Sequence, residues 1–283
     1  MRRELWTIGM IAPPFAISIL LFVGPLLYLF YVSLHGTSSS ELYGDWSLSN
    51  YAQVVSDPFY FVIIRRTLVT AAIILLLSLL IGYPVAYRIA RMPVRRRTIA
   101  MLLLLFPLMV SNVVRAYGWL AILGRRGVIN TTLRDAGVID LPMNLLFTPD
   151  AVVIGLLTIL LPYMVISITN ALVNLDPRYE EAAQALGAGP IRTFLHVTLP
   201  LSSPGVASGL LLVFLLTLSA YVTIAVLGGP QSKLLVSLVY DSVVSFQWPM
   251  AAALAFTLLL IALTVSGLIM AVLRPGRVQA GRR

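Results

Sequence analysis

The sequence predicts an all-α membrane protein with six transmembrane helices. Of its 283 residues, 59% are hydrophobic and only 11% are charged, whereas a soluble domain carries roughly 25% charged residues. The mean hydropathy is +0.94. The apolar residues gather in six segments, each long enough for the about 20 residues that cross a bilayer as a helix. A chain with so few charges cannot cover itself in water, so lipid is its solvent.

The six segments are expected to be helices, because backbone groups in lipid must form their hydrogen bonds within the segment. They are residues 6–34, 61–90, 98–123, 151–174, 204–227 and 249–273 of a single membrane domain, 1–283. The first segment is too long for a cleaved signal peptide and lacks a small-residue cleavage site after it. Pro13, Pro14 and Pro25 are expected to kink or interrupt its helix.

The distribution of arginine and lysine predicts that both termini are cytoplasmic. Lysine and arginine near membrane spans are more frequent on the cytoplasmic side. With both termini there, 13 of the 20 basic residues lie on that side. These are Arg2, Arg3, Arg88, Arg91, Arg95, Arg96, Arg97, Arg178, Arg192, Arg274, Arg277, Arg282 and Arg283; the others are Arg65, Arg66, Arg115, Arg125, Arg126, Arg134 and Lys233. The net charge of +9 therefore reflects membrane topology and does not indicate nucleic-acid binding.

Two outside segments are polar. Residues 36–58 contain Ser38, Ser39, Ser40, Glu41, Asp45 and Asp57 and are expected to form a surface loop. Residues 124–149 depart from the charge bias, because they carry three arginines. Within them, residues 128–136 are expected to form a short helix that ends at Gly137 and lies on the membrane.

Several chemistries are excluded by what the sequence lacks. There is no cysteine, and the two histidines, His35 and His196, are far apart, so disulfides and a multi-histidine metal site are excluded. Lys233, the only lysine, is not in a phosphate-binding loop. The spans contain no carboxylate pair that could act as acid and base. We therefore expect neither an enzyme nor a chain that binds ATP, a metal or another cofactor itself.

Residues 176–200 form the most informative cytoplasmic loop. Asp176 and Pro177 are typical of a helix start, and the acidic residues that follow suit a helix N-terminus. Residues 187–189, Gly-Ala-Gly, break this helix, and Pro190 can open a second one. The expected product is a hairpin of two short helices under the membrane. Physics alone leaves open whether this hairpin is only a connection or also a docking surface for another protein.

The same loop resembles the EAA motif of ABC importer permeases. The match consists of Glu181-Ala182-Ala183, three residues, Gly187, nine residues, Val197, one residue, and Leu199-Pro200. Its only departure is Val197, where isoleucine is usual. The resemblance implies a type I ABC importer permease fold in a bacterial inner membrane, and it covers nearly the whole chain.

The resemblance also implies roles and partners. Glu181, Ala182, Ala183, Gly187, Leu199 and Pro200 would couple the loop to an ATP-binding subunit, with Glu181 contacting that subunit and Gly187 forming the turn. ATP and Mg would be bound by two such partner subunits. A second, homologous permease subunit would complete the pathway, and a periplasmic solute-binding protein would deliver the substrate.

Further segments resemble the spermidine/putrescine branch of these permeases. They are Tyr83–Tyr87, Arg115–Trp119, Gly127–Asn130, Leu161–Met164, Ala185–Ala188 and Leu227–Pro230. The branch implies import of polyamines or of another small charged solute, such as an opine, a phosphonate or ferric iron. The spans contain no Asp or Glu, so aromatic faces or the partner permease would handle a polycation, or the substrate is not a polycation.

The residues expected to line a substrate pathway are Arg115, Tyr117, Trp119, Ser219, Tyr221, Thr223, Asp241 and Trp248. Each has an alternative role. The aromatic pair could belong to an interfacial belt, the two hydroxyl residues could join helices, and Asp241 could be a solvated loop acid. Arg65 and Arg66 are expected to reach lipid headgroups, whereas Arg115 is the basic residue best placed to face the pathway.

An alternative function is a secondary transporter driven by an ion gradient. Such proteins often carry internal repeats and charged residues within their spans. The absence of acidic residues from the spans and the motif in residues 176–200 favour the ATP-driven permease instead.

Overall fold

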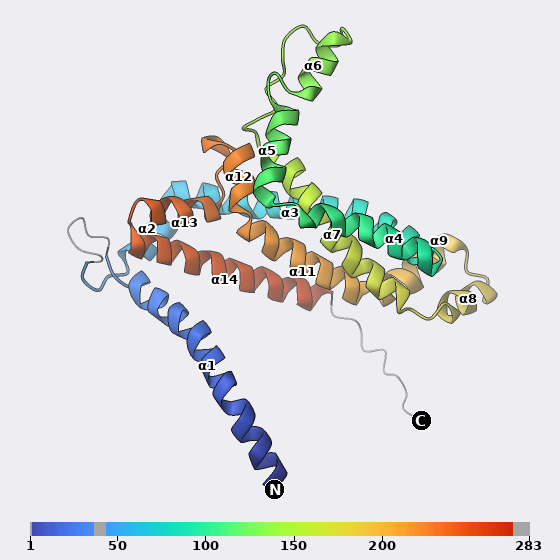
Figure 1. The fold of residues 1–283 in the computed structure, drawn as a ribbon, viewed down its shortest axis with the longest axis horizontal. Coiled ribbons are helices and arrows are strands. Elements are labelled where there is room, and N and C mark those ends of the chain that lie inside the picture. The colour runs from blue at the N-terminus through green and yellow to red at the C-terminus, as the bar shows by residue number, and fades with distance from the viewer. Residues whose placement is uncertain (1, 37–43, 274–283) are drawn as a thin grey trace. The chain divides into compact units, whose positions relative to one another are not determined.

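The computed structural model describes residues 2–36 and 44–273, with side chains from residue 13 onward. The helices in chain order are α1 Arg2–Ser33, α2 Ser49–Ser56, α3 Pro58–Ala90, α4 Val94–Leu105, α5 Asn112–Leu123, α6 Val128–Asp135, α7 Pro149–Val173, α8 Arg178–Ala185, α9 Pro190–Thr193, α10 Leu199–Leu201, α11 Ser203–Ser219, α12 Tyr221–Leu227, α13 Leu235–Val244 and α14 Trp248–Val272. Short 3-10 helices cover Phe106–Met109 and Pro230–Ser232, and a π-helix covers Phe194–Thr198 (Figure 1). The described residues hold no strand, only a bridge between His35 and Trp46.

By length and composition, four of these helices are suited to cross a membrane. They are α3, α7, α14 and the part Pro13–Ser33 of α1. Two bent helix pairs raise the number to as many as six if each pair is one span. This agrees with the expected all-α membrane fold. The helix α1 is continuous through its three prolines, so the interruption expected there is absent.

Two of the expected spans are broken. The segment expected to be one helix over 98–123 turns by 89° after Met109, where Val110 and Ser111 are extended. Pro107 contributes to this break because it has no N–H to donate. The segment expected over 204–227 breaks at Ala220, whose ψ of 53° ends α11 before α12 begins.

Two segments expected to be loops contain helices. Residues 49–56 form α2, and its Asn50 donates a hydrogen bond to the His35 carbonyl oxygen at 2.8 Å. Residues 235–244 form the apolar helix α13. Ser38, Ser39, Ser40, Glu41 and the four C-terminal arginines lie outside the described residues, and Arg2 and Arg3 lie outside the described side chains.

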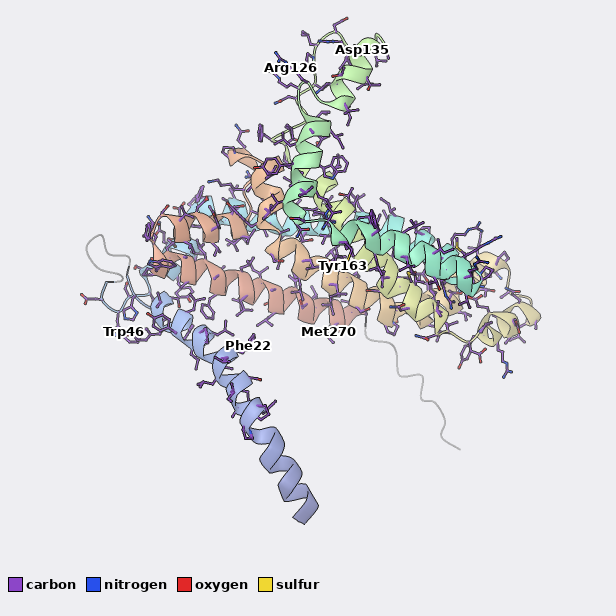
Figure 2. The ribbon with its side chains drawn as sticks, in the orientation of Figure 1. Phe22, Trp46, Arg126, Asp135, Tyr163 and Met270 are labelled. Atoms are coloured by element: carbon purple, nitrogen blue, oxygen red, sulfur yellow. The ribbon has the colours of Figure 1, made fainter. Side chains whose placement is uncertain are left out.

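The chain divides into two compact units. The first comprises Met1–Val62 and Leu238–Leu259, and the second comprises Ile63–Ser237 and Leu260–Arg283. In the first unit, Phe30 of α1 meets Phe256 of α14 edge to face, with ring centroids 5.2 Å apart. Phe22 and most other apolar side chains described on α1 are exposed, as lipid or a partner helix requires (Figure 2).

The second unit is built around α7. Its side chains Leu156, Met164 and Ile168 are almost fully buried in an apolar core. The helix α11 packs closely on α7, because Gly205 and Gly209 have no side chain at the contact: a Cβ on Gly205 would lie 2.3 Å from that of Ala171. Small residues four apart are a common device for packing helices in membranes.

Candidate functional site

The first candidate site is the helical hairpin that follows α7. Residues 178–185 form α8, Gly187 turns the chain with φ +88°, and Pro190 begins α9. A positive φ at this turn favours glycine, because other residues would strain there. The Asp176 side chain accepts a hydrogen bond from the Arg178 backbone N–H at 3.0 Å, which helps to start α8. The two short helices and the glycine turn therefore form as the sequence predicted.

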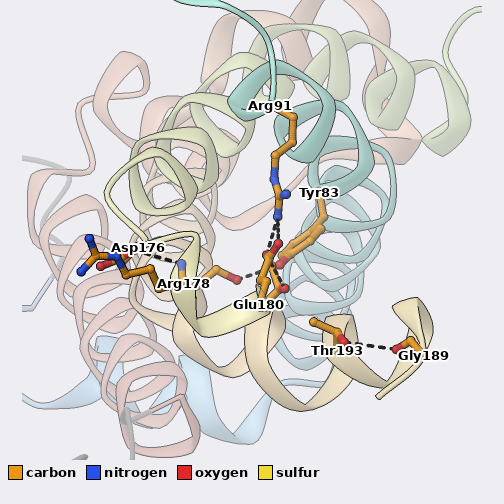
Figure 3. Close-up of polar contacts among 9 residues, drawn as sticks. Tyr83, Arg91, Asp176, Arg178, Glu180, Gly189 and Thr193 are labelled. Carbon is orange, nitrogen blue, oxygen red and sulfur yellow. Dashed lines mark hydrogen bonds and ion pairs between the residues drawn. The ribbon is translucent and has the colours of Figure 1, made fainter. Parts of the chain in front are cut away.

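A buried carboxylate anchors α8 to the rest of the unit. Glu180 is only 7% exposed, and its oxygens accept hydrogen bonds from the guanidinium of Arg91 (Figure 3). The Thr198 hydroxyl donates to the same carboxylate at 2.7 Å. A carboxylate shielded from water is costly unless it is paired and hydrogen-bonded, and here both conditions are met.

One face of the last turns of α3, together with Arg91 directly after the helix, holds both halves of the hairpin. Tyr83 and Tyr87 lie one turn apart, and the Arg91 guanidinium lies 4.7 Å from the centre of the Tyr87 ring. The Tyr83 and Ser202 hydroxyls share a hydrogen bond of 2.7 Å. Both tyrosine rings also meet Phe194 of the π-helix edge to face, at 5.5 and 5.8 Å. The hairpin is therefore in direct contact with α3 and with the residue before α11.

Sequence reasoning missed this anchor. Among the expected coupling residues, Glu181 and Gly187 are exposed and Ala183 is half-buried. Ala182, Leu199 and Pro200 are exposed as well. The spacing of Tyr83, Tyr87 and Arg91, each four residues apart, was a signal for one helix face, but nothing in the local sequence identified Glu180 as its partner.

The hairpin also presents apolar side chains that nothing in the described structure covers. Leu186 is 89% exposed and Ile191 is 74% exposed, and they flank the glycine turn. Tyr179 and Leu195 are also exposed. Several exposed apolar side chains on one short hairpin are typical of an interaction site.

The second candidate site is a pocket of about 160 Å³ beside α7. It is lined by Asn112, Leu156, Ile159, Leu160, Tyr163, Leu216, Ser219, Ala220, Tyr221, Val222 and Thr223. Asn112 follows the break between α4 and α5, and Ala220 is the break between α11 and α12. Breaks in membrane helices are tolerated where the backbone is buried in protein or lines a cavity, and such places often bind solutes.

Three of the expected pathway residues line this pocket: Ser219, Tyr221 and Thr223. Asn112 and Tyr163 join them, and the sequence did not single these two out. None of the lining residues is charged. The pocket thus offers hydroxyl groups, an amide and aromatic rings to a solute.

The other expected pathway residues lie elsewhere. The Arg115 guanidinium donates to the Asn112 side chain at 2.6 Å, and its Nε and Nη1 are shielded from solvent without a hydrogen-bond partner among the described residues. Tyr117 is 58% exposed, and Trp119 donates to the Thr158 hydroxyl at 3.1 Å. None of these three lines the pocket.

Asp241 and Trp248 belong to the first compact unit. Asp241 lies within α13, so the alternative that it occupies a loop is wrong. Trp248 contributes to a different, apolar pocket of about 360 Å³ that includes Tyr28 and Val243. In the second unit, Arg66 donates a hydrogen bond to the backbone oxygen of Gln231.

Apolar helices long enough to cross a membrane, a helical hairpin and a neutral pocket at two helix breaks are features expected of a membrane permease. Comparison with known proteins identifies its kind. The chain belongs to the family of binding-protein-dependent transport system inner membrane components, whose model matches residues 79–278.

Curated relatives agree. The chain is 36% identical over 217 residues to the spermidine/putrescine transport system permease protein PotB of Salmonella typhimurium, covering 76% of this chain and 75% of that one. It is 32% identical over 236 residues to PotB of Haemophilus influenzae, covering 83% and 82%. It is 34% identical over 194 residues to the molybdenum transport system permease protein ModB of Mycobacterium bovis, covering 68% and 71%.

A solved structure supports the fold. The crystal structure of a bacterial ABC transporter that imports the acidic polysaccharide alginate matches with a TM-score of 0.76 at 19% identity, covering 98% of this chain and 97% of that one. The protein is thus a permease subunit of a binding-protein-dependent importer and a multi-pass protein of the inner membrane. Its relatives are transport components rather than enzymes.

Proposed function

We propose that this permease subunit imports polyamines such as spermidine and putrescine, driven by ATP that partner subunits hydrolyse. The observation that carries the substrate is the likeness to the PotB permeases over about three quarters of the chain. The neutral pocket agrees with it, because aromatic faces and hydroxyl oxygens attract ammonium groups. The second permease subunit would line the other side of the pathway.

The complex we propose contains two ATP-binding subunits, a second homologous permease and a periplasmic solute-binding protein. Mg-ATP is bound by the ATP-binding subunits. Both termini and the hairpin face the cytoplasm, as the arginine distribution favours. The family's dependence on a binding protein supports the periplasmic partner.

In this complex, the ATP-binding subunit binds the hairpin and moves it when ATP binds. Its exposed tip, Leu186 and Ile191, would enter an apolar cleft of that subunit. Glu181 is exposed beside the tip and free to contact the same partner. The Glu180 anchor would carry the motion to α3 and α11, which opens or closes the pathway.

The substrate is tested by reconstituting the complex in proteoliposomes with its binding protein. We expect uptake of radiolabelled spermidine that requires ATP and is inhibited by excess putrescine. Uptake of molybdate with no uptake of spermidine would contradict a polyamine substrate, and uptake by this chain alone without ATP would contradict the ATP-driven mechanism.

Tyr163→Leu is expected to lower the maximal rate of spermidine uptake about tenfold, because a cation–π contact contributes about 0.5–2 kcal/mol. Tyr163 lines the pocket at the two helix breaks. The concentration for half-maximal uptake should change little, since the binding protein captures the substrate first. Tyr117→Leu is the matched control, because Tyr117 is exposed outside the pocket. Equal loss in both variants would place the effect outside the pocket.

Leu186→Asp and Ile191→Asp are each expected to weaken binding of the ATP-binding subunit at least tenfold. Each change puts a charge into an apolar contact and removes about 1.5–3 kcal/mol of buried side chain. The measurement is the amount of ATP-binding subunit that co-purifies with the permease. Val138→Asp, at an apolar residue that is 67% exposed beyond α6, is the control and should leave the complex intact. Normal co-purification of both hairpin variants would exclude the hairpin as the docking surface.

A further inference from the structure

The connection from α3 into α4 carries a concentrated positive charge beside the hairpin. Five arginines lie within ten residues of the chain: Arg88, Arg91, Arg95, Arg96 and Arg97. The sequence has no acidic residue from 58 to 134 that could offset them. Arg91 pairs with Glu180 of α8, so this connection lies against the hairpin (Figure 1). The side chains of the other four arginines form no ion pair or hydrogen bond within the described part of the chain.

Three of these arginines are poorly placed for the stability of α4 itself. Arg95, Arg96 and Arg97 lie in its first turn, which has no acidic residue, and Pro93 before it provides no side-chain cap. The helix dipole favours negative charge at this end of a helix. The guanidinium groups are therefore repelled by the dipole as well as by one another, and a bound anion would relieve both repulsions.

Two of the three arginines share a face of α4 with exposed apolar side chains. Residues three, four and seven apart lie on one face of a helix. The face that begins at Arg95 and Arg96 continues through side chains that are 51, 60, 69 and 70% exposed: Ile99, Leu102, Leu103 and Phe106. On the other side, Ala100, Met101 and Leu104 pack against the apolar core. We call the exposed side, Arg95 to Phe106, the charged α4 face.

The charged α4 face has the dimensions and the polarity of one phospholipid. From Arg96 to Phe106 the chain rises about 15 Å at 1.5 Å per residue, which is half of the about 30 Å of a bilayer core. A soluble anion would satisfy the arginines and leave the apolar side chains uncovered. An apolar helix of another protein would cover those side chains and leave the arginines without an anion. An anionic phospholipid complements both parts.

We propose that the charged α4 face binds an anionic phospholipid from the leaflet on the hairpin side of the membrane. Its phosphate lies between Arg95 and Arg96, and an acyl chain runs along Ile99 to Phe106. Arginine clusters at the end of a membrane span attract anionic lipids, and guanidinium groups bind phosphate through paired hydrogen bonds. The inference requires only that α4 lies in a membrane, so it does not depend on which solute is imported.

The test measures how tightly the complete importer, purified in detergent, holds added lipid. Dioleoyl phosphatidylglycerol is titrated into the complex, and native mass spectrometry gives the dissociation constant of the tightest-bound lipid. Arg95→Gln combined with Arg96→Gln is the test variant. Arg125→Gln combined with Arg126→Gln is the matched control, because it removes the same charge from two adjacent exposed arginines outside α4. Arg95→Lys combined with Arg96→Lys keeps the charge and controls for folding.

We expect the test variant to bind phosphatidylglycerol about twenty-fivefold more weakly, because each arginine near the membrane surface contributes roughly fivefold to the attraction of an anionic lipid. The lysine variant and the matched control should stay within about threefold of wild type. Excess glycerol phosphate, which has the charged group without acyl chains, should not displace the lipid. Phosphatidylcholine, which has no net charge, should bind the wild-type complex and the test variant equally.

Three results would overturn the proposal. Equal weakening in the test variant and the matched control would show attraction by overall charge alone. Displacement of the lipid by glycerol phosphate would assign the arginines to a soluble anion. Loss of a protein subunit from the complex in the test variant would assign the charged α4 face to that subunit. None of these measurements uses uptake, so a failure to import spermidine would overturn the proposed substrate and leave the lipid site standing.

Discussion

Arg91→Ala is expected to lower ATP-driven uptake about 100-fold while the protein still inserts in the membrane. The substitution leaves Glu180, whose side chain is buried, without its counter-charge. Removing one member of a buried ion pair costs about 3–5 kcal/mol. Because the Arg91 side chain is 47% exposed, we take the lower end. If this energy is lost from the docked state of α8, the fraction of docked hairpin, and with it coupled uptake, falls about a hundredfold at 1.4 kcal/mol per tenfold. The measurements are uptake and ATPase activity of the reconstituted importer.

A double variant separates coupling from simple loss of charge. Arg91→Ala combined with Glu180→Leu has no unpaired charge, so it should regain at least tenfold of the uptake lost in the single variant. Arg88→Ala, at an exposed residue in the last turn of α3, should behave like wild type. Wild-type uptake in Arg91→Ala, or a double variant worse than the single one, would contradict the anchor.

Gly205→Leu is expected to prevent α7 and α11 from packing and to destabilise the second unit by about 3 kcal/mol or more, since overpacking of a filled interior typically costs 1–3 kcal/mol. Already a Cβ at this position would lie 2.3 Å from the Ala171 Cβ and 2.9 Å from the Ser167 carbonyl oxygen. The two helices would have to separate. The measurement is the SDS fraction at which the micelle-bound protein unfolds, followed by circular dichroism.

The glycine prediction has a matched control. Gly267 lies in α14, and a Cβ there would meet nothing within 4 Å. Gly267→Leu should therefore unfold at the same SDS fraction as the wild-type protein. Gly205→Ala should be intermediate, because one added carbon can be accommodated by a small shift. Equal stability of the two leucine variants would show that the contact at Gly205 is not close in the membrane.

Much of the site followed from local chemistry. The apolar segments predicted membrane helices, and the Asp-Pro start, the Gly-Ala-Gly turn and Pro190 predicted the two short helices of the hairpin, which the structure contains. The motif in residues 181–200 predicted the permease family, which the comparisons confirm. The coupling roles of Glu181 and its neighbours stay predictions.

The substrate pathway was only partly predictable. Ser219, Tyr221 and Thr223 line one pocket because a helix break at Ala220 turns them toward α7. The sequence around Ala220 is mostly apolar and has no nearby glycine or proline, so it gives no signal for a helix break there. Asn112 and Tyr163 come from other helices, so their place beside these residues depends on how the helices pack.

The sequence by itself determined that this chain crosses a membrane, where its hairpin forms and to which family it belongs. These follow from hydrophobic content, turn chemistry and a gapped motif, all of which are local along the chain. Only the tertiary structure decided that Glu180 is buried and Glu181 exposed. Both are acids in the first turn of α8, and the choice between them depends on the face that meets Arg91, 89 residues earlier. Such a contact depends on tertiary packing, because Glu180 and Glu181 are chemically identical and differ only in which residues pack against them.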